Sequence, residues 1–131
     1  MGPVGRSRTM KRVPILLFLS LLPLGGLLAH PPSKVRLSFD WSKKVLHVEL
    51  PHHVRDVAQH HIDRILIKRG ETVLFDQAVA EQSELKLHRA TFAIPSAKPG
   101  DVLEVTASCN RYGKKTGRIT LTLPEEGQPT P

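Results

Sequence analysis

Cysteine is almost absent from this chain of 131 residues, and aromatic side chains are scarce. Because Cys109 is the only thiol, the chain cannot form an internal disulfide, and a hydrophobic core has to stabilise it alone. A lone thiol is buried and inert, binds a metal, or bonds to another molecule. Aromatic residues make up only 5% of the chain, and the basic residues are scattered among acidic ones. A nucleic-acid partner is therefore not expected.

The first 29 residues have the pattern of a signal peptide. An apolar run from Val13 to Leu28 ends at Ala29, a small residue suited to cleavage. Four basic residues precede the run: Arg6, Arg8, Lys11 and Arg12. Pro and Gly interrupt this short run, so stable membrane insertion after cleavage is not expected. Cleavage after Ala29 would leave 15 basic and 12 acidic residues, and the protein would be exported, either to a periplasm or out of the cell.

Alternation of apolar and polar side chains runs through the rest of the chain and predicts β-strands. The expected strands are 35–39, 46–50, 62–68, 72–75, 85–94, 103–109 and 119–123. Seven short strands separated by turns, without an amphipathic helix or an internal repeat, are typical of an all-β, immunoglobulin-like β-sandwich. We expect this domain to span residues 30–124 and a disordered tail to span 125–131.

The histidines are concentrated early in the domain. Five of the seven lie within fifteen residues: His47, His52, His53, His60 and His61. Neutral imidazole and thiolate are well suited to transition metals, so the fold is expected to bring some of them to Cys109. Strand alternation points Cys109 inward and His47 outward, and adjacent histidines face opposite ways. At most one of each adjacent pair is therefore expected to reach a given metal. His88, among charged neighbours, is expected on the surface.

Three short motifs occur together along the domain. His30 opens His-Pro-Pro, His52 and His60 bracket a loop before an Ile-rich strand, and Cys109 opens Cys-Asn-Arg-Tyr-Gly. In this combination the chain resembles the iron-binding domain of the superoxide reductases, the desulfoferrodoxin and neelaredoxin family, from about residue 30 to 123. The resemblance implies an immunoglobulin-like sandwich. It also implies a mononuclear, non-haem iron site that reduces superoxide to hydrogen peroxide.

Carried over by position, the resemblance implies four metal ligands in this chain. His30, His52 and His60 would be equatorial ligands, and Cys109 the axial one. The partner of the domain would be a small redox species or an electron-donor protein. The family has a further His ligand where this chain has Tyr112, and its His-bracketed loop is usually shorter. Whether the domain is an enzyme therefore stays open.

Two interpretations without catalysis also fit the sequence. If cleavage follows Ala29, His30 would carry both an imidazole and a free α-amine, which together chelate copper well. The domain would then be an exported copper or other metal carrier. Alternatively, Cys109 is a small buried hydrophobe and the histidines are solvated. In that case the sandwich would bind a protein partner without any metal.

Overall fold

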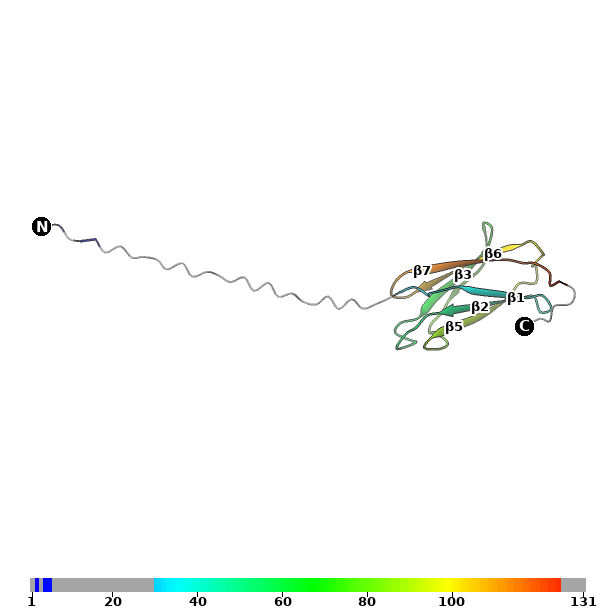
Figure 1. Ribbon diagram of the computed structural model, residues 1–131, viewed down its shortest axis with the longest axis horizontal. Coiled ribbons are helices and arrows are strands. Elements are labelled where there is room, and N and C mark those ends of the chain that lie inside the picture. The colour runs from blue at the N-terminus through cyan, green and yellow to red at the C-terminus, as the bar shows by residue number, and fades with distance from the viewer. Residues whose placement is uncertain (1, 3, 6–29, 126–131) are drawn as a thin grey trace.

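The computed structural model describes residues 2, 4–5 and 30–125 (Figure 1). The expected signal peptide falls almost wholly outside the described residues, as does 126–131 of the expected tail. Within the described part of the chain, no helix has the length and apolar character needed to cross a membrane.

Seven strands form two antiparallel sheets that pack face to face (Figure 1). The strands are β1 (Arg36–Asp40), β2 (Val45–Pro51), β3 (Ile62–Arg69), β4 (Thr72–Ala78), β5 (Leu87–Ala93), β6 (Val102–Cys109) and β7 (Lys114–Thr120). One sheet has the order β1-β2-β5 and the other the order β4-β3-β6-β7. This architecture confirms the all-β, immunoglobulin-like sandwich predicted from the alternation.

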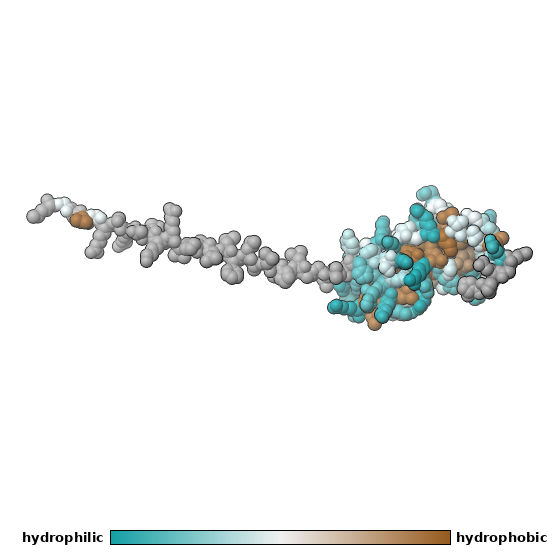
Figure 2. Space-filling model, in the orientation of Figure 1, coloured by the Kyte–Doolittle hydropathy of each residue, from teal (hydrophilic) through white to brown (hydrophobic). Residues whose placement is uncertain are grey.

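The core lies between the sheets, where the apolar residues of each alternating pattern meet. The residues least exposed to solvent come mainly from β2, β3 and β6: Leu46, Val48, Leu50, Ile62, Ile65, Ile67, Leu103, Val105 and Ala107. Hydrophilic side chains cover much of the face seen in Figure 2, and hydrophobic atoms gather towards its centre. Without a disulfide, burial of this apolar surface supplies the main stabilisation.

The last strand begins earlier than the sequence pattern predicted. The expectation was residues 119–123, whereas β7 runs from Lys114 to Thr120. It is an edge strand, and its first three residues are exposed on both faces. Such a strand needs no apolar alternation, because its hydrogen bonds to β6 hold it in place. A tight turn ending at Gly113, whose φ is 79°, starts β7 opposite Ser108.

Gly117 lies where β7 passes closest to the segment that leads into β1. A Cβ atom at this position would lie 2.7 Å from Cβ of Val35 and 3.2 Å from its carbonyl oxygen. We expect Gly117→Ala to lower the free energy of unfolding by about 1–3 kcal/mol, because the two sheets must separate locally. Urea unfolding measures the change, with exposed Lys115→Ala as the control on the same strand. Equal stability of Gly117→Ala and the parent would contradict the close approach.

Candidate metal centre

Strand pairing brings distant parts of the chain together at one end of the sandwich. β3 and β6 run antiparallel, and Ile62 at the start of β3 pairs with Cys109 at the end of β6. His60, two residues before Ile62, therefore lies beside the thiol. His52 immediately follows the last residue of β2 and enters the same region from the opposite sheet. The site thus bridges the two sheets.

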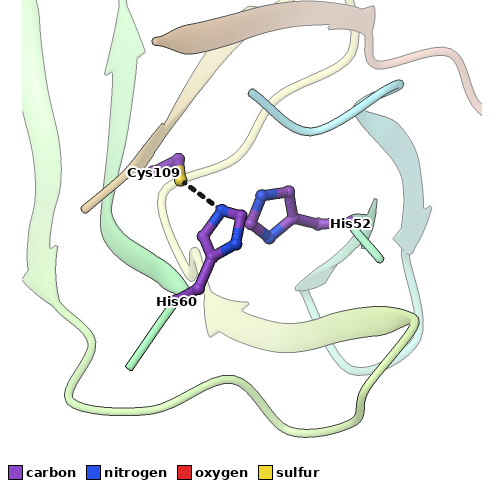
Figure 3. A group of neighbouring side chains, drawn as sticks. All are labelled: His52, His60 and Cys109. Carbon is purple, nitrogen blue, oxygen red and sulfur yellow. Dashed lines mark hydrogen bonds between the residues drawn. The ribbon is translucent and has the colours of Figure 1, made fainter. Parts of the chain in front are cut away.

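The contact between His60 and Cys109 is the centre of this cluster. Nε2 of His60 lies 3.1 Å from Sγ of Cys109 (Figure 3). Potential ligand atoms of His52, His60 and Cys109 all lie within 4.8 Å of one another. Figure 3 shows the two imidazoles side by side, with the sulfur next to the His60 ring. Among the described residues, this is the group of three or more His, Cys, Asp or Glu side chains close enough to share a metal.

His30, the fourth residue predicted from the sequence, lies beside this group of three. Its ring centroid lies 5.2 Å from that of His52 and 5.9 Å from that of His60. Unlike His52 it is exposed, so it forms the solvent side of the cluster. Its segment packs on the turn after β6, where a Cβ on Gly113 would lie 3.2 Å from the Pro31 side chain. The glycine of the Cys-Asn-Arg-Tyr-Gly motif therefore lets the His30 segment approach the thiol.

Asn110 fixes the main chain on both sides of His60. Its Oδ1 accepts a hydrogen bond from the His61 amide at 2.9 Å, and its Nδ2 donates to the Gln59 carbonyl at 3.1 Å. Its own amide donates to the His61 carbonyl. Because Asn110 directly follows Cys109, these bonds hold His60 in register with the thiol. The sequence placed this asparagine in a motif, but gave no sign of which groups it binds.

Burial lowers the pKa of the His60 imidazole, and electrostatic repulsion from nearby His52 and Arg111 lowers it further. The surroundings of His60 therefore favour its neutral form. A neutral imidazole has the lone pair that a metal needs, because protonation removes it. Cys109 itself is 7% exposed and forms no disulfide. Imidazole nitrogens around a buried thiol form a donor set that fits iron, zinc or copper.

A residue that sequence reasoning missed lies behind His52. Gln82, in the connection between β4 and β5, is 2% exposed and its Oε1 lies 2.7 Å from Nδ1 of His52. His52 is also buried, at 1% exposed. A glutamine in a polar loop carries no periodic signal, so only the folded arrangement reveals this contact.

Among the described residues, the other histidines are not part of this group of potential ligands. His47 is exposed as predicted, and His53 is exposed beside buried His52. Tyr112, at the position of the family's last His ligand, is 67% exposed. The expectation that His88 lies on the surface was wrong, because it is buried at 7% exposed. Its ring accepts a hydrogen bond from the Ser83 amide at 3.1 Å.

Burial of His88 has a consequence for stability at acidic pH. Burial lowers its pKa below the usual 6.5, and nearby His61 lowers it further. Between the folded pKa and about 6.5 the unfolded chain binds more protons, so the metal-free protein should lose stability as the pH falls below about 6.5. His60 adds to this loss in the same direction. His88→Gln, which keeps an acceptor for Ser83, should reduce the slope.

Urea unfolding across this pH range measures the effect. The exposed His47→Gln variant serves as the matched control and should retain the parent's slope. An undiminished slope in His88→Gln would show that His88 does not contribute.

The fold and the cluster define the class of protein: an immunoglobulin-like sandwich with a His/Cys group at one end. No model of a protein family matches this chain, and no curated protein does. Solved structures do. Superoxide reductase (1Fe-SOR) from Giardia intestinalis is 16% identical with a TM-score of 0.51, over 70% of this chain and 100% of that one.

Two neelaredoxin structures are more distant. The superoxide reductase (neelaredoxin) from Ignicoccus hospitalis is 17% identical with a TM-score of 0.42, over 71% of this chain and 80% of that one. The reduced form from Archaeoglobus fulgidus is 17% identical with a TM-score of 0.42, over 72% and 91%. The Giardia structure, with its TM-score of 0.51, shows that this chain has a fold similar to that of superoxide reductase, as the resemblance predicted.

Proposed function

We propose that this protein is an exported, superoxide reductase-like domain that holds one non-haem iron through His30, His52, His60 and Cys109. The observation that carries the proposal is the contact between Nε2 of His60 and Sγ of Cys109, with His52 beside them, on a superoxide reductase fold. A bound iron would supply the single electron that, with two protons, converts superoxide to hydrogen peroxide.

The residues around the cluster have separate tasks in this proposal. The Cys109 sulfur would donate electron density to a bound metal, which would favour loss of an electron. Imidazole ligands carry no negative charge, so they would leave the site attractive to an anion. Exposed His30 marks the side open to solvent, where a small anion can enter. Arg111 is exposed and near enough to lower the pKa of His60, so its guanidinium also attracts the anion.

The steps outside the site complete the proposal. An electron-donor protein would restore the reduced state after each turnover. Export would follow from residues 1–29 acting as a signal peptide, with His30 then at or near the mature N-terminus.

One observation favours a metal carrier as the second candidate. Two imidazoles and one thiol lie within 4.8 Å of one another, the His30 ring lies beside them, and Tyr112, at the position of a further family ligand, is 67% exposed. Divalent copper and zinc bind such nitrogen and sulfur sites more tightly than ferrous iron does. If cleavage frees the α-amine of His30, the preference for copper becomes stronger.

Metal loading followed by superoxide kinetics tests the proposal. The exported protein is purified without oxygen, its N-terminus is sequenced, and it is loaded with ferrous iron, or with zinc as a redox-inert control. We expect one iron per chain, and one peroxide formed per superoxide consumed by the iron form only. Binding of copper or zinc with no reaction of the iron form would establish the carrier instead. Failure to bind any metal would leave the metal-free interaction domain.

A further inference from the structure

Gln82 is held by three hydrogen bonds. Its Nε2 donates to the carbonyl oxygens of His52 and Glu84, both at 2.7 Å. Its Oε1 faces Nδ1 of His52, also at 2.7 Å. Both side chains in this contact are almost completely buried. The polar atoms of Gln82 therefore contact the chain itself rather than water.

The two carbonyl groups determine which way the amide of Gln82 points. Carbonyl oxygens only accept hydrogen bonds, so the NH₂ group must face them. A flipped amide would bring its oxygen against two other oxygens and leave the NH₂ group against the imidazole. The oxygen Oε1 consequently faces Nδ1 of His52. Because an amide oxygen only accepts, this contact is a hydrogen bond when Nδ1 carries the hydrogen.

We propose that Gln82 is a positioning residue that sets the tautomer of His52, so that Nε2 has the lone pair for a metal. This deepens the proposed function and rests on its metal site. A ligating histidine generally donates its other ring N–H to an outer acceptor, which fixes the ring and raises its basicity. Gln82 supplies that acceptor from a different loop, 30 residues along the chain.

The surroundings of Nε2 show why this control matters. Nε2 of His52 lies 2.9 Å from the carbonyl oxygen of His30. Without Gln82, the neutral ring would move its hydrogen to Nε2 and donate it to that oxygen, which would block the lone pair. Both ring nitrogens therefore face an acceptor, and a neutral ring donates to only one of them. Gln82 favours the hydrogen on Nδ1, because its oxygen is closer and its amide is held by two further hydrogen bonds, whereas His30 is exposed. Gln82 thus disfavours the tautomer that competes with metal binding.

Nitrogen NMR of the metal-free protein tests the tautomer directly, at a pH where imidazoles are neutral. We expect the hydrogen on Nδ1 of His52 in the parent and in Gln82→Glu, which keeps an acceptor oxygen. We expect a shift to Nε2 in Gln82→Leu. A hydrogen on Nε2 in the parent, or no change in Gln82→Leu, would overturn the inference. This result does not depend on whether a metal binds, so it is separable from failure of the proposed function.

Zinc affinity, measured by competition with a chelator, tests the consequence. Gln82→Leu should weaken zinc binding by about 10–100-fold, and exposed Gln77→Leu should not change it. Gln82→Glu loses the two bonds to the carbonyls, so it should lose stability and yet bind zinc more tightly than Gln82→Leu. Circular dichroism confirms that each variant is folded. If both Gln82 variants lose affinity in proportion to their lost stability, the residue is merely structural.

Discussion

Replacing Cys109 with serine should abolish the thiolate-to-metal charge-transfer absorption of the ferric protein. Because the chain has no other thiol, any such band must come from Cys109. A serine hydroxyl stays protonated near neutral pH and supplies no comparable donor. Metal affinity should also fall. Removing a hydrogen-bond partner of a metal ligand lowers metal affinity roughly 10–100-fold, and removing Cys109 should lower it further, because Cys109 would be a ligand itself. Visible spectroscopy of the iron-loaded protein measures the first effect, and metal competition the second.

Tyr112→Phe is the matched control for this experiment. A phenolate bound to ferric iron also absorbs in the visible, but the Tyr112 side chain is 67% exposed. The band should therefore survive in Tyr112→Phe. If the band persists in Cys109→Ser and disappears in Tyr112→Phe, the tyrosine is the ligand and the proposed role of Cys109 is wrong.

Strand alternation was enough to predict the fold, because each inner strand buries one face. Leu46, Val48 and Leu50 on β2 are all buried at 1% exposed or less, as their spacing indicates. The same rule failed for β7, since an edge strand is held by backbone hydrogen bonds that side-chain pattern does not report. His88 is a different case. It lies four residues before buried Phe92 on the same strand, so the two side chains point to the same face. This even spacing could have predicted that His88 is buried.

The candidate site was predictable only in part. Alternation indicated that Cys109 points inward, and the family resemblance selected three of the histidines. The structure brings His52, His60 and Cys109 within 4.8 Å of one another, with the His30 ring beside them, while their binding of a metal stays a prediction. Asn110 and Gln82 could not be assigned roles, because each acts through contacts across 30 or more residues of sequence. Polar residues in loops are usually solvated, so only the fold shows which ones are held inside.

Metal binding should stabilise the folded protein by an amount that rivals its own stability. At free metal about a thousandfold above the dissociation constant, the free energy of unfolding should rise by about 4 kcal/mol. For a domain of this size, each kcal/mol gained raises the melting temperature by about 4–8 °C. The physical reason is that His60 and Cys109 are 49 residues apart, so the unfolded chain cannot present them together. Urea unfolding with and without zinc measures the gain.

The matched variants separate this site from other histidines on the same loop. His60→Ala removes the imidazole that contacts the thiol and should lose most of the gain, whereas His53→Ala removes an exposed neighbour and should keep it. Because His60 is only half-buried, its removal should alter the metal-free stability less than it alters the metal-dependent part. An equal gain in the parent and His60→Ala would mean that zinc binds elsewhere. This measurement therefore tests whether the loop before β3 and the end of β6 hold one metal jointly.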